Sequence, residues 1–323
     1  MPIFEVNDLH LHYLTRFGAK IHAVAGVSFS MEQGEILGIA GESGCGKSTL
    51  VNGLMGLFIP PLYPTSGDVR VGGESLMGRT PKDIRENVLA RKVSMIPQGA
   101  INALNPTRKI KHLAMDLIKS HEKGGNKNEI QKRLYDRFNL LGLDAERVLN
   151  SFPIELTAGE RQRSVIGLTT LLDPEMVIAD EPTSALDVTT QKAVIKLIFN
   201  LLDKKIFSTM IFITHELPLL RHVAHRIAIM YAGQFVELGT AEQVVFDPRH
   251  PYTRALMDAM LSAEPGQAKK ETKPLEGAPP NLAHPISGCR FAARCPSAKP
   301  DCRINEQSLR IVGERQVRCD YAE

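Results

Sequence analysis

Residues 41–49 read GESGCGKST and have the spacing of a phosphate-binding loop between a strand and a helix. Glycines at such positions let successive backbone N–H groups turn toward phosphate oxygens without a Cβ in the way. Lys47 is expected to reach the β- and γ-phosphates of a nucleotide, Ser48 to bind Mg²⁺, and Thr49 to support the phosphates. Cys45 stands at a variable position, where a small filler is a simpler interpretation than a redox group. The complete spacing disfavours a merely structural glycine-rich turn.

A pair of carboxylates follows an apolar run at residues 176–181, which read MVIADE. Phosphoryl transfer requires a carboxylate in the Mg²⁺ shell and a group that positions the attacking water. Asp180 fits the first role and Glu181 fits the second, as a general base. Two carboxylates at the end of a strand are weak evidence by themselves. Their position about 130 residues after the phosphate-binding loop makes the pattern specific.

Two further polar residues each follow an apolar run. Gln98 comes after the run ending at Ile96, and His215 comes after the run ending at Ile213. In open α/β sheets, ligands gather at the carboxyl ends of strands. Gln98 is therefore expected to join the Mg²⁺ shell and, with His215, to sense the γ-phosphate. Either residue alone would more simply be structural.

The pattern along the chain predicts an α/β domain at residues 1–247 and an extension at 248–323. Strands are expected at 35–40, 93–96, 176–179, 210–213 and 226–230, and a helix at 50–55. A mostly helical insertion is expected at about 100–170, with a loop at 122–126. Pro, Gly and Ala become frequent at 264–266 and 277–280, as in an extended arm.

The bulk composition excludes several classes of protein. The 323 residues carry 39 basic and 36 acidic side chains, a net charge of +3, which is too balanced to suggest nucleic-acid binding. No run approaches the roughly 20 apolar residues of a membrane span. The N-terminus, MPIFEVNDLH, does not have the pattern of a signal peptide. We therefore expect the chain to remain in the cytosol and any membrane spans to come from partners.

Four of the five cysteines lie near the end of the sequence, with the spacing C-x5-C-x6-C-x16-C. They are Cys289, Cys295, Cys302 and Cys319. Disulfides are not expected in a reducing cytosol. Four thiolates can hold an iron–sulfur cluster, whereas zinc sites usually have tighter cysteine pairs; zinc and free thiols remain alternatives. The large sequence separation from residues 41–49 suggests a structural or regulatory role.

Residues 156–163, which read LTAGERQR, and 180–187, which read DEPTSALD, complete a set of motifs. In this order the motifs resemble the ATP-binding-cassette (ABC) family. The resemblance implies a P-loop NTPase with a RecA-like α/β core, an antiparallel β subdomain, an α-helical subdomain and here a cysteine-rich C-terminal extension. It also implies that two cassettes pair head to tail, so that Thr157 and Gly159 contact the partner's ATP, and that Tyr13 stacks on adenine. The expected nucleotide-binding residues are Tyr13, Gly41, Ser43, Gly44, Cys45, Gly46, Lys47, Ser48, Thr49, Thr157, Gly159 and Asp180.

A closer resemblance is to the oligopeptide/dipeptide importer ATPases. It rests on ALNP at 103–106, ADEPTSALDVT at 179–189, PRHPYTRAL at 248–256 and the cysteine segment from Gly288 to Cys319. It implies a peptide substrate, an extracytoplasmic binding protein, two membrane permease subunits and a second, different ATPase. It also implies a [4Fe–4S] cluster on the four cysteines and a location at the cytoplasmic face of the membrane. Relatives that carry oligosaccharides, nickel or glutathione leave those substrates open.

Two other classes of function fit less well. Soluble cassette ATPases of DNA repair or translation generally have two cassettes or a long coiled coil, and this sequence has neither. A nucleotide-binding scaffold without activity would not need Glu181 and His215.

The segment from Leu156 to Glu160, LTAGE, departs from the LSGGQ-like string of the family. Thr157 keeps a hydroxyl, but Ala158 adds a methyl group and Glu160 adds a negative charge. We expect a weakened signature, which would make the two ATP sites of the dimer unequal.

Overall fold

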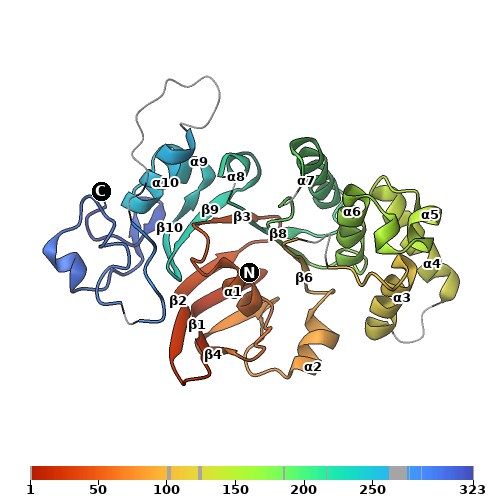
Figure 1. The fold of residues 1–323 in the computed structure, drawn as a ribbon, viewed down its shortest axis with the longest axis horizontal. Coiled ribbons are helices and arrows are strands. Elements are labelled where there is room, and N and C mark those ends of the chain that lie inside the picture. The colour runs from red at the N-terminus through yellow and green to blue at the C-terminus, as the bar shows by residue number, and fades with distance from the viewer. Residues whose placement is uncertain are drawn as a thin grey trace. The chain divides into compact units, whose positions relative to one another are not determined.

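The chain folds into two compact units in this computed structural model (Figure 1). The first unit comprises residues 1–77 and 212–323, and the second comprises residues 78–211. The structure describes residues 2–99, 103–122, 126–184, 186–215, 217–261, 275, 277–284 and 286–322. Residues 123–125 of the expected loop, Ala185 and the expected arm at 264–266 lie outside these residues.

The first unit contains a four-stranded antiparallel sheet in the order β2-β1-β4-β5. Its strands are β1 (Phe4–Leu14), β2 (Lys20–Met31), β4 (Leu62–Val71) and β5 (Glu74–Ser75). Near the end of β1, Tyr13 pairs with Ile21 on one side and Leu62 on the other. This sheet corresponds to the antiparallel subdomain that the family resemblance implies.

The same unit contributes strands to a second sheet, in the order β11-β12-β10-β9-β3. They are β3 (Ile36–Ala40), β9 (Arg226–Tyr231), β10 (Gln234–Thr240), β11 (Arg310–Val312) and β12 (Arg315–Val317). All five residues of β3 are buried, and β3 runs parallel to β9. Such a strand needs an apolar sequence on both faces, which explains why it could be predicted.

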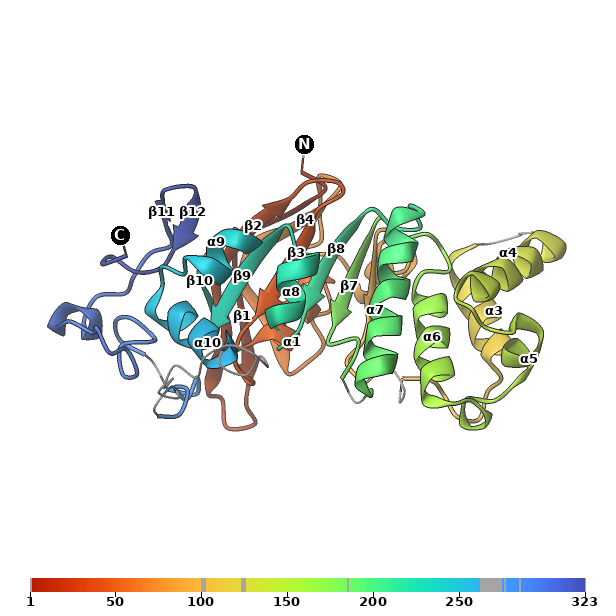
Figure 2. The same cartoon turned by 90° about the horizontal axis from the view of Figure 1, so that it is seen from above.

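The first unit also contains helices. They are α1 (Lys47–Leu54), α8 (Leu217–Val223), α9 (Ala241–Phe246), α10 (Pro251–Leu261) and the 3₁₀ turn η4 (Pro300–Arg303). Helix α8 lies beside β3 (Figure 2). The approach depends on Gly38, because a Cβ there would lie 2.9 Å from Cδ2 of Leu220.

The second unit combines two parallel strands with a group of helices. Strands β6 (Val93–Ile96) and β7 (Met176–Asp180) pair in register from Val93 and Met176 onward. The helices are α2 (Pro81–Asp83), the π-turn η1 (Ile84–Val88), α3 (Ile110–His121), α4 (Lys127–Leu140), α5 (Ala145–Asn150), the 3₁₀ turn η3 (Pro153–Glu155), α6 (Ala158–Thr169) and α7 (Val188–Asp203). Helices α3 to α6 fall inside the interval expected to be helical.

The five strands predicted from apolar runs are confirmed as β3, β6, β7, β8 (Thr209–Ile213) and β9. Strand β8 runs across the boundary between the two units, at residues 211 and 212. Among the described residues, no helix has the length and apolar character that crossing a membrane requires.

Candidate ATP-binding and cysteine sites

The phosphate-binding loop occupies the turn between β3 and α1. Its backbone passes so close to neighbouring carbonyls that side chains do not fit at two positions. A Cβ on Gly41 would lie 2.1 Å from the Met230 carbonyl oxygen, and one on Gly46 would lie 2.4 Å from the Ala23 carbonyl oxygen. Gly44 and Gly46 have φ values of 78° and 108°, which favour glycine. The glycines are therefore required by the path of the chain.

Lys47 is the first residue of α1, and its side chain is only 8% exposed. Its Nζ donates hydrogen bonds to the carbonyl oxygens of Gly41 (2.7 Å) and Glu42 (3.0 Å). The ammonium group is thus held at the loop, beside the N-terminus of a helix, where anions are favoured. Ser48 is exposed and Thr49 is buried. An exposed hydroxyl in the first turn fits the role predicted for Ser48 as a ligand of Mg²⁺.

Tyr13 lies next to the loop although 28 residues separate it from Gly41. Its hydroxyl and that of Thr49 form a hydrogen bond of 3.1 Å. The ring is half-buried, which leaves part of it accessible. This position is compatible with a contact to the base of a nucleotide whose phosphates occupy the loop.

His215 follows β8 within the first unit and is exposed. The preceding residue, Thr214, donates its backbone N–H to the Ile39 carbonyl oxygen (3.3 Å). Because Ile39 precedes the loop by two residues, the end of β8 lies beside the end of β3. The first unit therefore brings together the loop, Tyr13 and the segment that carries His215.

The second unit brings two of the predicted catalytic residues into contact. Nε2 of Gln98, just after β6, donates to Oε2 of Glu181 (3.1 Å), just after β7. Asp180 ends β7 and is 7% exposed. Glu181 has φ 45°, a conformation that costs a residue with a side chain about 1–2 kcal/mol and that recurs at functional sites.

The segment LTAGE leads into the first turn of helix α6, with Thr157 and Ala158 exposed and Leu156 buried. Thr157 is the N-cap: its Oγ1 accepts from the Glu160 N–H (3.2 Å), and its own N–H donates to Oε2 of Glu160 (2.9 Å). Arg147 forms an ion pair with the same carboxylate. Partial burial alone would raise the pKa of Glu160, but the hydrogen bonds from Thr157 and Arg147 outweigh it and lower this pKa. The negative charge expected from Glu160 is present, but it is paired and used to cap the helix.

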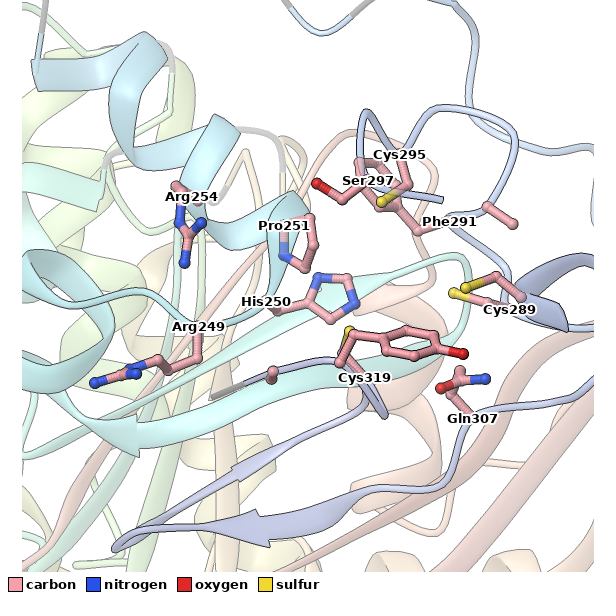
Figure 3. Close-up of a pocket in the computed structure, with 14 residues that line it drawn as sticks. Arg249, His250, Pro251, Arg254, Cys289, Phe291, Cys295, Ser297, Gln307 and Cys319 are labelled. Atoms are coloured by element: carbon pink, nitrogen blue, oxygen red, sulfur yellow. The ribbon is translucent and has the colours of Figure 1, made fainter. Parts of the chain in front are cut away.

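The four C-terminal cysteines line one cavity of about 310 Å³ (Figure 3). Cys289, Cys295 and Cys319 gather there with the imidazole of His250, and Cys302 also lines the cavity. All five cysteines of the chain are free of disulfides. Burial, together with the neighbouring cysteines, raises the pKa of the Cys289 and Cys295 thiols.

The donor set at this cavity suits soft metals, but its geometry is not that of a single-ion site. On one zinc ion, four thiolates lie about 3.8 Å apart, as follows from Zn–S bonds of about 2.3 Å. Within the described part of the chain, no three His, Cys, Asp or Glu side chains are placed to hold one metal ion. The structure therefore shows four cysteines lining one cavity and no single-ion site among the described residues.

Sequence reasoning missed a contact between the extension and the phosphate-binding loop. Arg294 forms two hydrogen bonds with the Glu42 carboxylate, at 2.7 and 2.9 Å. The Tyr252 hydroxyl accepts the Glu42 backbone N–H at 3.0 Å. The sequence contains no signal for these pairs, because Arg294 lies 252 residues after Glu42. The cysteine segment is thus far from the loop in sequence but contacts it in space through Arg294.

Comparisons with known proteins identify the family of this chain. Residues 24–184 match a family described as ABC transporter, and residues 236–302 match the C-terminal region of oligopeptide/dipeptide transporters. The chain is 40% identical to the oligopeptide transport ATP-binding protein OppD of Bacillus subtilis, covering 90% of this chain and 81% of OppD. It is 37% identical to the dipeptide transport ATP-binding protein DppD of Escherichia coli, covering 99% and 97%.

Similarity to solved structures supports the same fold. A dimeric ATP-binding cassette, MJ0796, bound to ADP and Pi in a post-hydrolysis state, superposes with a TM-score of 0.64 at 24% identity. The match covers 74% of this chain and 98% of that cassette. At this identity the structural match shows the fold alone. The matches to OppD and DppD have higher identity and cover most of the chain, so they show the family. The chain therefore belongs to the ATP-binding subunits of ABC transporters, within the oligopeptide/dipeptide family.

Proposed function

We propose that this chain binds and hydrolyses MgATP and so energises an ABC importer of dipeptides or oligopeptides across the cytoplasmic membrane. The observation that carries the proposal is the loop at residues 41–49, in which two glycines accommodate close carbonyls and Lys47 is held at a helix N-terminus. The names of OppD and DppD support a peptide as the transported substrate.

Each predicted residue has a role in this proposal. In the first unit, Lys47 and the loop amides bind the phosphates, Ser48 binds Mg²⁺, Tyr13 contacts adenine and His215 senses the γ-phosphate. In the second unit, the proposed roles fall on Asp180 and Gln98 as Mg²⁺ ligands, directly or through water, on Glu181 as general base, and on Thr157 and Gly159 toward the partner's nucleotide. The remaining loop residues of this set are Gly41, Ser43, Gly44, Cys45, Gly46 and Thr49.

The hydrogen bond between Gln98 and Glu181 suits a base that is held until substrate arrives. A carboxylate accepts the proton of the attacking water most effectively when a neighbouring group fixes its orientation. The amide of Gln98 donates to Glu181 without adding charge, so the carboxylate remains a competent base. A Mg²⁺ ion would draw the amide oxygen of Gln98 toward itself.

The proposed assembly has two membrane permease subunits, a second homologous ATPase and an extracytoplasmic binding protein, at the cytoplasmic face of the membrane. The paired state of Glu160 supports unequal ATP sites, because the hydroxyl of Thr157 donates to this carboxylate (3.0 Å) and must exchange it for a phosphate. We propose residues 1–247 as the cassette and residues 248–323 as the extension. In the structure the extension is part of the first unit.

We also propose that Cys289, Cys295, Cys302 and Cys319 hold a [4Fe–4S] cluster. The shared cavity and the absence of disulfides at these cysteines support this group. When bound, the cluster would cross-link the parts of the extension that carry these four cysteines. The neutral imidazole of His250, whose pKa burial lowers to about 3, adds no charge to that cavity.

Reconstituted proteoliposomes with the permease pair, the second ATPase and the binding protein test the proposed substrate. Dipeptides and tripeptides are expected to stimulate ATP hydrolysis and to accumulate in the lumen. Glutathione, Ni²⁺ and an oligosaccharide serve as comparison substrates. Stimulation by one of these three and none by peptides would refute the peptide assignment while leaving the motor role intact.

A further inference from the structure

A short segment of the extension contacts the phosphate-binding loop directly at Glu42. We call residues 290–294, which lie between Cys289 and Cys295, the brace. The Arg294 side chain is 6% exposed and meets the Glu42 carboxylate, which is 25% exposed, in a two-point hydrogen-bonded pair. Such bidentate pairs are both strong and geometrically specific. The brace therefore fixes the position of Glu42.

Aromatic packing supports the same contact. Phe291 of the brace packs edge-on against Tyr231 and Tyr252, with ring centroids 5.2 and 5.4 Å apart. Tyr252 is fully buried, and its hydroxyl accepts the backbone N–H of Glu42. The side chain and the backbone of Glu42 are thus both held by residues of the extension.

A second arginine of the brace, Arg290, is linked to the loop indirectly, through the turn between β9 and β10. Arg290 donates to the Ala232 carbonyl oxygen in the turn between β9 and β10. The next residue in that turn, Gly233, donates its N–H to the Cys45 carbonyl oxygen at 2.7 Å. The brace therefore reaches the loop at Glu42 directly and at Cys45 through a turn.

The charge of Glu42 makes this contact important for a phosphate ligand. Glu42 is the second residue of the loop, and its carbonyl oxygen accepts from Nζ of Lys47. An unpaired carboxylate at this place would repel the phosphates of ATP. We propose that Arg294 is a positioning residue for ATP binding, which neutralises Glu42 and holds the first turn of the loop in its phosphate-binding conformation. The proposal rests on the proposed role of residues 41–49 as the phosphate site.

The test is equilibrium binding of Mg²⁺ and a non-hydrolysable ATP analogue to the full-length chain. Arg294→Met is expected to weaken binding about tenfold, as an uncompensated charge near the phosphates would. Arg294→Lys, which keeps the charge but loses the two-point geometry, is expected to weaken it about threefold. In the double variant Arg294→Met/Glu42→Gln, binding is expected to return to within about threefold of wild type because the repelling charge is gone.

Arg315→Met is the matched control. It removes another arginine of the extension that is 9% exposed and paired with carboxylates, those of Asp247 and Glu237, without touching the loop. Its melting temperature is expected to fall as in Arg294→Met, while affinity for the analogue stays within about twofold of wild type. Equal affinities for Arg294→Met and wild type would overturn the proposal. So would a double variant as weak as Arg294→Met, since Arg294 would then act through packing alone.

Two further outcomes are separable. If Arg294→Met does not fold, Arg294→Lys still decides the matter, because a wild-type affinity in Arg294→Lys contradicts the geometric part of the proposal. Lys47→Ala distinguishes this inference from the assignment on which it rests. Lost binding in Lys47→Ala with no effect in the Arg294 variants would refute only the role of Arg294; unchanged binding in Lys47→Ala would refute the phosphate site itself.

Discussion

Substitution of Gly46 by alanine tests whether the backbone path of the loop creates the phosphate site. A Cβ on Gly46 would lie 2.4 Å from the Ala23 carbonyl oxygen, and Cβ contacts essentially never fall under 3.0 Å, so the loop must move by at least 0.6 Å. The φ of 108° adds strain of about 1–2 kcal/mol. Displacements approaching 1 Å cost about 100-fold where several groups must converge on one ligand. Gly46→Ala is therefore expected to weaken MgATP binding about 100-fold.

Gly44→Ala provides the matched comparison for this prediction. Gly44 also has a positive φ, 78°, but a Cβ there meets nothing within 4 Å. In Gly44→Ala only the backbone strain from the positive φ remains, so the affinity for MgATP is expected to fall less than about tenfold. Calorimetric titration of the full-length variants with MgATP measures both, and circular dichroism checks that each is folded. Equal losses in the two variants would refute the argument, because close approach at Gly46 would then have no particular importance.

Three other predictions concern the signature, the adenine contact and the cysteines. Glu160→Gln keeps a side chain that can cap α6 but removes the charge, so ATPase activity of the assembled transporter is expected to rise about two- to fivefold. Because its pKa is lowered, the stability that Glu160 adds is present above pH 4.5 and is lost only as the pH falls through the folded-state pKa; thermal melts from pH 7 to pH 3 should show this loss in wild type and less of it in Glu160→Gln. Tyr13→Phe, which keeps a ring and loses the hydrogen bond to Thr49, is expected to weaken ATP binding less than about threefold, and Tyr13→Ala about tenfold, both by titration. Cys302→Ser is expected to abolish an absorbance band at about 400 nm after anaerobic purification, whereas Cys45→Ser keeps it; a colourless wild type with one bound zinc would contradict the cluster.

The parts of the fold that could be predicted from sequence are those with a strong local signal. Strand β3 is buried at all five positions, and so is β7, so their apolar runs are unbroken. The long strands β1 and β2 were not predicted from their residues. Both mix buried and exposed positions irregularly, and their pairing contains register shifts. Their presence followed only from the resemblance to a family.

The candidate site divides in the same way. The glycines and Lys47 form a contiguous motif whose spacing reports its geometry. The pairing of Arg294 with Glu42 and the capping of α6 by Glu160 depend on where side chains meet after folding. Glu160 was expected to weaken the signature by its charge, and sequence alone gave no reason to pair it with Arg147.

The catalytic role of this chain's site is tested most directly by ATP hydrolysis in the complete transporter containing wild type, Glu181→Gln or Glu175→Gln. Glu175→Gln is the matched control, because it makes the same chemical change at the residue that precedes β7, while Glu181 follows the end of that strand. Glu181→Gln is expected to bind MgATP and to lose hydrolysis by a factor of about 100 or more, whereas Glu175→Gln is expected to behave as wild type. Equal hydrolysis in all three proteins would contradict the assignment of this chain's site as catalytic.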